Sequence, residues 1–376
     1  MARSAQAYVR GSTVKFYEWL ETAKGKVPEG PPVWICGDCH VGNLGPVADS
    51  KGNVEIEIRD LDQTVIGNPA HDLIRLALSL SMAARSSDLP GVTTALMLEK
   101  IMSGYSDALK PGKARPGIPT GKSGKPIRIV LKEALTRKWR HLAAERIEDV
   151  RPTIPLGRKF WALSKKEHDQ IRKLFESKEA KSLVVNLFQE AKHDKVEVLD
   201  AAYWMKGCSS LGRLRYAVLL GVGSRFCLID IKEAVEAAAP GKKSKEVPRD
   251  YAERLVKGAC ALSPYLGDRM VAAKFGNRSI VIRELRPQDL KFELDQITQQ
   301  EAVEAARFLA GVVGKAHARQ MDSKTRKLWL TRLKGHRGKT LDAPSWLWTS
   351  VVELVAAHEA AYLEHCRRFA LAANNA

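Results

Sequence analysis

Two neighbouring stretches decide the fold of this chain: PPVWICGDCHVGN, residues 31–43, and VEIEIRDLDQTVIGNPAHDL, residues 54–73. The apolar run before Gly37 and the alternating run over residues 54–58 both predict β-strands, with a loop between them. After Pro69 apolar residues recur at helical spacing, and proline is favoured in the first turn of a helix. The stretch therefore predicts strand, loop, strand, loop and helix.

Polar residues follow each of the two predicted strands. Asp38 and Asn43 lie in the loop after the first strand, and Asp60 and Asp62 follow the second. Phosphoryl transfer from ATP needs a carboxylate that orients and deprotonates the attacking hydroxyl, and oxygen ligands that hold Mg²⁺ on the phosphates. The spacing therefore predicts Asp38 as the catalytic base, with Asn43 and Asp60 as metal ligands. Asp62 is either a second metal ligand or a turn former.

The charge of the chain is distributed unevenly. There are 61 Lys and Arg against 43 Asp and Glu, a net charge of +18. Residues 110–140 contain ten basic residues and one acid, residues 324–339 seven basic residues and no acid, whereas residues 31–75 contain seven acids and three bases. A basic excess favours phosphate-bearing partners, although a charge run is as often a solvated face. We expect the basic segments to attract an anionic acceptor rather than ATP, and nucleic acid is a possible but less favoured partner.

The composition limits the class of protein. With 376 residues, 45% hydrophobic and 28% charged, the chain can bury a sizeable core, which suggests two or three lobes. Its six cysteines are too few for a disulfide framework, and its first residues lack the apolar core of a signal peptide. No uncharged apolar run approaches the roughly 18 residues of a membrane span. We therefore expect a cytoplasmic protein with no membrane partner.

Farther along, a small β-rich region is expected between helical regions. Residues 221–224, GVGS, join two apolar runs and predict a β-hairpin. The predicted fold is α+β in three parts: 1–199 with the loop and the basic excursion, 200–286 rich in strands, and 287–376 helical. The individual predictions are strands at 216–220, 226–231 and 277–285, and helices at 129–147, 163–193, 250–262, 298–317 and 345–369.

The segments around Asp38 resemble a known enzyme signature. GDCHVGN (37–43), DLD (60–62) and GNPAHDL (67–73) are similar to the C-terminal lobe of aminoglycoside phosphotransferases and related kinase-like enzymes. Cys36 stands where that pattern has a His, and Asn68 where it has an Asp.

The chain as a whole resembles more closely a bacterial family, domain of unknown function 2252, which is grouped with the kinase-like folds. The resemblance covers about residues 5–320, and it supports a fold and a site better than a substrate. It rests on the segments just named and on YVRG (8–11), GCSSLG (207–212), KEA (232–234), REL (283–285) and AHAR (316–319).

The second half of the chain supplies the parts that a kinase-like site still lacks. A glycine-rich turn can lay backbone N–H groups over phosphates, and a lysine on the third strand can pair with their oxygens. Gly207, Ser209, Ser210 and Gly212 form the candidate turn, and Lys232 is the candidate lysine. Ser209 replaces the middle glycine of the family's pattern, so the backbone there is less free.

The same resemblance implies partners for the lysine and for the adenine ring. A kinase pairs its lysine with a glutamate on a helix of the small lobe; Glu253 is the candidate here, and Glu233 is a weaker one. The hinge that would receive adenine lies near residues 281–285, which include Arg283 and Glu284.

Other polar residues of the loop have supporting roles by analogy with the kinase-like pattern. His40 is expected to orient the loop and Asp72 to hydrogen-bond it. The string from Cys36 through Cys39 to His40 is also that of c-type haem attachment, which needs an exported chain. A zinc site there would need two further ligands. Both alternatives are therefore weaker than a supporting role.

The order of these parts differs from that of an ordinary kinase, because the catalytic loop precedes the glycine-rich turn and the lysine. A circular permutation preserves spatial neighbours when the new termini are exposed. The resemblance therefore implies a two-lobed, circularly permuted protein-kinase-like fold, with a small antiparallel β lobe and a larger helical lobe. We expect Asp38, Asn43, Asp60 and Lys232 to converge in one cleft.

The resulting prediction is an ATP- and Mg²⁺-dependent phosphotransferase that acts on a hydroxyl of an unidentified acceptor. One alternative is a nucleotide-binding pseudokinase or regulatory module whose basic segments bind nucleic acid or another polyanion. Another alternative is a nucleotidyltransferase. The intact set of Asp38, Asn43, Asp60 and Lys232 argues against an inactive site.

Overall fold

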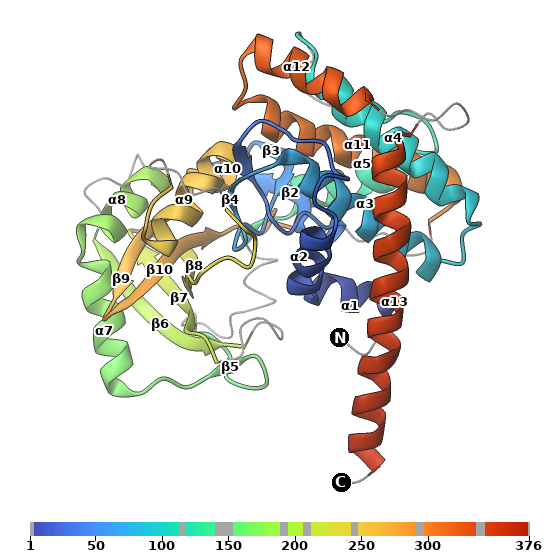
Figure 1. Ribbon diagram of the computed structural model, residues 1–376. Helices are drawn as coiled ribbons and strands as arrows, with labels where there is room; N and C mark the ends of the chain where they lie inside the picture. The colour runs from blue at the N-terminus through green and yellow to red at the C-terminus, as the bar shows by residue number, and fades with distance from the viewer. Residues whose placement is uncertain are drawn as a thin grey trace.

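The computed structural model describes residues 4–112, 117–139, 153–188, 195–205, 212–241, 247–290, 297–335 and 343–374. Helices and antiparallel sheets make up this part of the chain, so the predicted α+β class is confirmed. Most helices and two short ribbons gather on one side, which we call the helical part, and a six-stranded sheet with its own helices lies on the other side, which we call the sheet part (Figure 1).

The stretch that holds Asp38 and Asp60 folds into two small antiparallel ribbons followed by a long helix. The expected strands and helix are present, and two further strands complete the ribbons. Asn68 caps the helix, since its side chain accepts a hydrogen bond from the amide of Ala70. The elements are β1 (Val33–Ile35) paired with β4 (Val65–Gly67), η1 (Val41–Asn43), β2 (Leu44–Ala48) paired with β3 (Val54–Ile58), and α3 (Pro69–Ser86).

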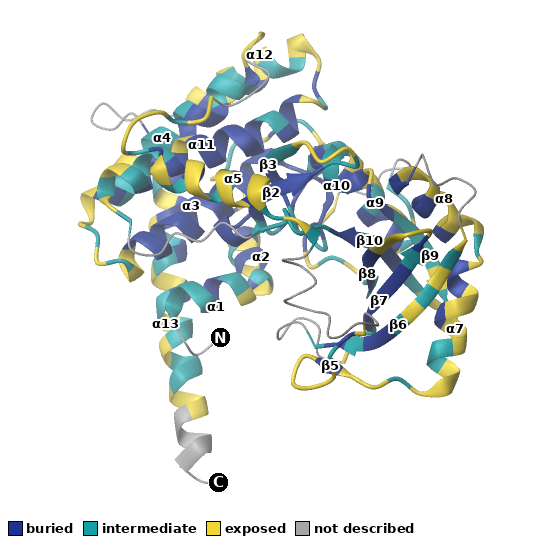
Figure 2. Cartoon of the chain, turned by 180° about the vertical axis from the view of Figure 1, so that it is seen from behind, coloured by how far each residue is buried: buried dark blue, intermediate teal, exposed yellow. Residues whose placement is uncertain are grey.

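The core of the helical part forms around α3, which is buried along most of its length (Figure 2). Its neighbours come from both ends of the sequence, and α13 continues well beyond the body of the molecule (Figure 1). Among the described residues, none of the helices combines the length and the apolar character needed to cross a membrane. The other helices of this part are α1 (Ala5–Gly11), α2 (Thr13–Thr22), α4 (Val92–Leu109), α5 (Lys125–Thr136), α11 (Gln299–Ala318), α12 (Ser323–Lys334) and α13 (Ser345–Asn374). Of these, α1, α4, α11 and α13 contact α3.

The sheet part has the strand order β5-β6-β7-β8-β10-β9, antiparallel throughout. The predicted hairpin is present as β7 and β8. One face of the sheet packs on α7 and α8, and α9 and α10 lie toward the helical part and share its core. The elements are β5 (Phe160–Trp161), α7 (Lys165–Phe175), α8 (Lys178–Leu187), β6 (Val196–Trp204), β7 (Arg215–Val222), β8 (Arg225–Glu233), α9 (Tyr251–Leu262), α10 (Pro264–Gly267), β9 (Met270–Phe275) and β10 (Arg278–Leu285).

Comparison of the observed helices with the expected ones shows where the spacing of apolar residues alone predicts a helix correctly. The helices expected at 298–317 and 345–369 are confirmed as α11 and α13. The expected helix at 163–193 is two helices, because the Ser177 side chain accepts from the amide of Ala180 and starts α8 as a new helix. The helix expected at 129–147 is observed as α5 up to Thr136, and residues 140–147 lie outside the described residues. Residues 160–187 pack on the sheet, although the division at 199/200 groups them with the first helical region.

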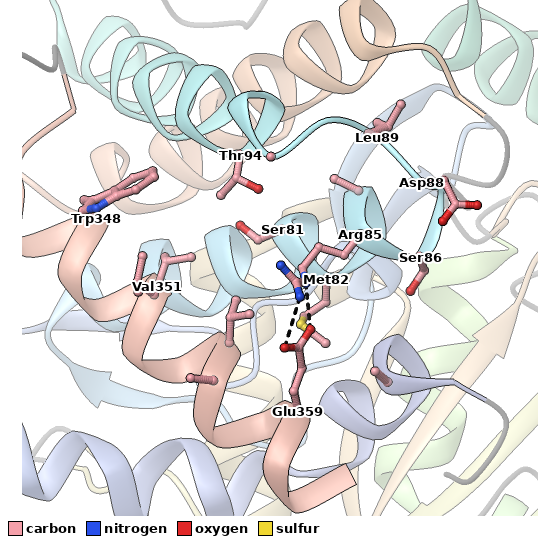
Figure 3. Close-up of a pocket in the computed structure, with 16 residues that line it drawn as sticks. Ser81, Met82, Arg85, Ser86, Asp88, Leu89, Thr94, Trp348, Val351 and Glu359 are labelled. Atoms are coloured by element: carbon pink, nitrogen blue, oxygen red, sulfur yellow. Dashed lines mark hydrogen bonds and ion pairs between the residues drawn. The ribbon is translucent and has the colours of Figure 1, made fainter. Parts of the chain in front are cut away.

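A separate hollow of about 760 Å³ lies between α3, the start of α4 and α13, on the side of the helical part away from the sheet (Figure 3). Apolar side chains such as Met82, Leu89 and Val351 form much of its wall. Arg85 and Glu359 face each other across it in a two-pronged ion pair, with Nε–Oε1 and Nη2–Oε2 distances of 2.7 and 3.2 Å. This hollow contains none of the predicted site residues.

The contact between α4 and α11 provides a test of the helical core. A Cβ atom added at Gly104 would lie 2.0 Å from the carbonyl oxygen of Arg307, so the two helices touch through a glycine. Gly104→Ala is therefore expected to reduce the free energy of unfolding by about 1–3 kcal/mol or more, as overpacking does. Gly91→Ala, where a Cβ meets nothing within 4 Å, is the matched control. Urea denaturation measures both; equal stability of the two variants would contradict this packing.

Candidate active site

The loop before Asp38 is held in place by one buried carboxylate. Asp72, in the first turn of α3, is 1% exposed and accepts hydrogen bonds from the amides of Cys36 at 2.7 Å and Gly37 at 3.0 Å. Gly37 has a φ of +75°, and a Cβ there would lie 2.1 Å from the carbonyl oxygen of Gln63. Only glycine fits this turn, so backbone and carboxylate together fix the path of the loop.

Asp72 is itself held by a chain of buried side chains. His317 Nε2 lies 3.1 Å from Asp72 Oδ2, and His317 Nδ1 lies 3.0 Å from the Tyr105 hydroxyl. The indole N–H of Trp329 donates to the same hydroxyl at 3.1 Å. Since the Tyr105 oxygen accepts from Trp329, its hydrogen can be donated to Nδ1, and Nε2–H of His317 to Asp72. The chain connects the loop to α4, α11 and α12.

The expected base, Asp38, already has two side-chain donors. Its Oδ1 accepts from Arg75 Nε at 2.8 Å and its Oδ2 from the Thr13 hydroxyl at 2.9 Å. Arg75 is fully buried, whereas the Asp38 side chain keeps 14% of its surface exposed. The side-chain amide nitrogen of Asn43 donates to the backbone carbonyl oxygen of Asp38 at 2.9 Å, and this bond fixes the orientation of the Asn43 side chain. Asp38 is thus charge-compensated and oriented while still open to solvent on one side.

His40 is buried within the same loop. Its Nε2 lies 3.9 Å from Asp38 Oδ2, and its Nδ1 has no hydrogen-bond partner among the described residues. Burial lowers the pKa of His40 to about 4; Asp38 opposes this shift, and the positive charges of Arg75 and Arg10 add to it. The imidazole is therefore neutral at pH 7, in keeping with the orienting role expected of it.

The structure brings Lys232 together with the acidic turn after β3. Lys232 Nζ forms a close ion pair with Asp62 and lies 3.9 Å from Asp60 Oδ1. The turn is tied to the loop, because the amide of Arg59 donates to the Asn43 carbonyl at 2.7 Å. Residues far apart in the sequence therefore share one site.

The two carboxylates beside Lys232 differ in acidity. Desolvation would raise the pKa of Asp60, but the charges of Lys232 and Arg283 outweigh it, so this pKa lies well below its usual range. Desolvation and the neighbouring Asp60 charge raise the pKa of Asp62 despite Lys232. Asp60 is therefore the more acidic of the two carboxylates.

A polar cluster that the sequence analysis did not identify lies beside Lys232 on the sheet. Arg215 binds Asp230 through Nε at 2.9 Å and Nη2 at 2.5 Å, and its guanidinium stacks 4.8 Å from the Trp204 ring centre. Arg283, expected at the adenine, instead binds Asp230 at 3.2 Å and donates to the Arg59 carbonyl at 3.3 Å. In the sequence, the signal for this cluster is the alternation of charged residues on one strand, with Asp230 two residues before Lys232.

The expected pair of Lys232 with Glu253 is not formed among the described residues, and helix α9 presents an arginine to the acidic turn instead. Glu253 is exposed in the first turn of α9, and no ion pair between it and Lys232 is found in the part of the chain that the structure describes. Glu233 binds the Leu214 amide and Arg278. The inward residue of α9 is Arg254.

Arg254 connects α9 to the acidic turn. It donates to the carbonyls of Thr64, Asp62 and Val235, the last two at 3.2 and 2.8 Å. Its side chain is buried, and the carbonyl acceptors satisfy much of its hydrogen-bonding capacity. Asp62 therefore takes the place expected for the glutamate, and Arg254 fixes the backbone that presents it.

The expected hinge also requires a correction. The backbone of residues 281–283 is paired on both sides, with β8 and with β9, so it is not available to a ligand. The Glu284 amide donates to the Arg269 carbonyl at 3.0 Å, and its buried carboxylate accepts from Arg286 Nε at 2.7 Å. Backbone groups that could meet a base begin only after Leu285, in the connection to the helical part.

The candidate phosphate-binding turn is described only at its end. Gly207, Ser209 and Ser210 lie outside the described residues. Gly212 is exposed with a φ of +75°, a conformation that favours glycine, and lies between β6 and β7.

The oxygen ligands expected for Mg²⁺ are Asn43, Asp60 and Asp62. Among the described residues, no three His, Cys, Asp or Glu side chains form a group that could hold a metal ion. Mg²⁺ usually takes one or two carboxylates, with substrate phosphates and water completing its shell. Two carboxylates and one amide fit such a partial set, with Lys232 present as a competing cation for Asp62.

The buried imidazole of His40 makes a testable contribution to stability. In the folded protein it takes up a proton only near pH 4, whereas an unfolded histidine does so near pH 6.5. Acid therefore favours the unfolded state progressively from pH 6.5 down to 4, by about 3 kcal/mol for this residue. His40→Gln should show a correspondingly shallower loss of stability in urea denaturation over that range. Above pH 7.5 the difference between the two proteins should be constant; parallel curves over the whole range would contradict a buried neutral His40.

Comparison with known proteins identifies a family but no activity. Residues 1–368 match the family model described as an uncharacterized protein conserved in bacteria, DUF2252. Neither the curated proteins nor the solved structures gave a match. Because the family model covers nearly the whole sequence, the chain belongs to the DUF2252 family.

Proposed function

We propose that this protein transfers the γ-phosphoryl group of Mg²⁺-bound ATP to a hydroxyl group, using a two-lobed, circularly permuted kinase-like fold. The observation that carries the proposal is the meeting of Lys232 with Asp60 and Asp62. Lys232 and Asp62 are 170 residues apart, and a lysine facing two carboxylates beside a second Asp-bearing loop is the arrangement that phosphoryl transfer uses.

The topology supports a kinase-like division into two lobes. Lys232 lies on β8, an inner strand of an antiparallel sheet. β8 forms a hairpin with β7, and this hairpin follows the candidate phosphate-binding turn. The loop and the acidic turn belong to the helical part, and residues 286–290 follow the last sheet strand toward α11. Placing the loop before the sheet in sequence is the order that a circular permutation produces.

Each residue of the site has a role in the proposed reaction. Bound Mg²⁺, held by Asp60, Asp62 and the Asn43 amide oxygen, would neutralise the charge of the phosphates. Lys232 pairs with Asp62 in this structure and would exchange that partner for a phosphate oxygen. Arg75 and Thr13 orient Asp38, whose carboxylate has further lone pairs to accept the hydroxyl proton of the acceptor.

The surface for an adenine ring would be the apolar inner face of the sheet. Leu219, Leu228 and Leu285 form an apolar cluster on this face. Leu228 lies on β8, two residues before Asp230. Ile154 is buried in the same cluster, and Trp139 packs against it. A base bound on this face would have to displace the side chains of Ile154 and Trp139.

This coverage favours a second candidate function, a regulatory module that binds nucleotide without turning it over. In that case the covered face and the hydrogen-bonded Asp38 would be features of a sensing state. The meeting of Lys232 with Asp60 and Asp62 favours the enzyme over the module, because phosphoryl transfer needs the cation and the carboxylates in one place.

Labelled ATP separates these functions. We expect the protein, with Mg²⁺ and a pool of small hydroxyl compounds, to move the γ-label and not the α-label. Lys232→Met and Asp60→Asn should each reduce label transfer by about 100-fold or more, because each removes charge stabilisation from the phosphates. Lys274→Met, which alters an exposed lysine paired with Asp250 on the edge strand β9 of the same sheet, is the matched control and should leave transfer unchanged.

Three outcomes would contradict the proposal. Movement of the α-label identifies a nucleotidyltransferase. Nucleotide binding without movement of either label identifies the regulatory module. Equal transfer by Lys232→Met and the Lys274→Met control, with both proteins folded by circular dichroism, would show that the reaction takes place elsewhere.

A further inference from the structure

The corner between α1 and α2 lies directly against the loop that holds Asp38. Thr13 donates to Asp38, and the Tyr17 hydroxyl donates to the Gly37 carbonyl at 2.5 Å. Arg75 joins the two segments, since it binds Asp38 and donates to the Val9 carbonyl at 2.6 Å. The corner therefore forms one wall beside the expected base. This wall comes from the start of the chain, far in sequence from the strand that bears Lys232.

Arg10 lies on this wall with no acceptor among the residues that the structure describes. It belongs to the last turn of α1, within the segment YVRG, and it is half-buried. Its guanidinium packs on Gly42 of the loop: a Cβ added there would lie 2.9 Å from the guanidinium carbon and from Nη2. Among the described residues, no hydrogen bond or ion pair to Arg10 is found. A guanidinium held in position but left without an acceptor is suited to bind a ligand.

The groups around Arg10 are rich in donors. Arg10 packs on Gly42 and Arg75 binds Asp38, so both guanidinium groups lie against the loop that contains His40. Arg75 Nη1 and His40 Nδ1, on side chains that are 0% and 5% exposed, have no partners among the described residues. Asp38 compensates only one of the two guanidinium charges. Within the described part of the chain, Arg10 is therefore a cation at the loop with no ion pair of its own.

We infer that Arg10 binds an anionic oxygen group, a phosphate or carboxylate, on the compound that receives the phosphoryl group. An arginine recognises such groups through two parallel hydrogen bonds, which fixes orientation as well as position. A group bound at Arg10 would hold a hydroxyl of the same compound next to Asp38. The identity of the bound compound as acceptor rests on the proposed function, whereas the anion site itself does not.

The test measures anion binding with simple probes. Inorganic phosphate and acetate are titrated separately into the full chain by isothermal calorimetry, for the unaltered protein and for Arg10→Gln, Arg10→Lys, Lys232→Met and Arg85→Gln. Arg85 lies in the separate hollow on α3 and controls for the loss of one arginine. We expect Arg10→Gln to weaken binding of at least one probe by 10-fold or more, as loss of a two-pronged contact would. Arg10→Lys should lose less, the Arg10-dependent binding should persist in Lys232→Met, and Arg85→Gln should bind as the unaltered protein does.

The outcomes separate this inference from the proposed function. Absence of saturable binding by the unaltered protein, or equal binding by Arg10→Gln, would overturn the anion site. Loss of all binding in Lys232→Met would place the anion beside the acidic turn and would also overturn it. Binding that depends on Arg10 in a protein that moves no label from ATP would leave the anion site in place and remove the phosphotransferase. The probe that binds more tightly assigns the group as phosphate or carboxylate.

Discussion

The buried carboxylate of Asp72 is the constraint on which the rest of the site depends. A carboxylate removed from water is costly unless its oxygens are hydrogen-bonded, and here two backbone amides and one imidazole meet that need. The same bonds determine where the loop runs, so the position of Asp38 follows from the satisfaction of Asp72. Because His317 lies on α11, the loop depends on a helix from the other end of the chain.

The second constraint is electrostatic, and it acts between the helical part and the sheet part. Lys232 compensates two adjacent carboxylates, while Arg283 and Arg254 reach backbone carbonyls of the same acidic turn. Charged donors that bind carbonyls hold a backbone in place without neutralising its carboxylates. The acidic turn is therefore fixed from the sheet side and from α9, with Lys232 beside its two carboxylates.

Capping residues and strand periodicity predict much of the local structure in residues 31–73. They do not predict which side chains from distant segments pack against it. Asn68 and Pro69 identify the start of α3, and alternating residues identify β3, because capping and strand periodicity are local properties. Asp60, Asp62 and Lys232 were recognised from their positions after predicted strands. Periodicity gave no hint of Arg254, because its acceptors are backbone carbonyls of distant segments. Glu253 and Arg254 are adjacent on α9, and the sequence shows which residues lie on a helix but not which of them faces inward.

The sequence by itself determined the α+β class, the acidic stretch with its loop and turn, and the residues that could bind a cation or a phosphate. Only the tertiary structure decided which of them meet: Lys232 with Asp62 rather than Glu253, Arg283 with Asp230 rather than a ligand, and Arg10 with the glycine of the loop. The physical reason is that hydrogen bonds and ion pairs act over a few ångströms. Which side chains come within that range depends on the packing of segments far apart in the chain.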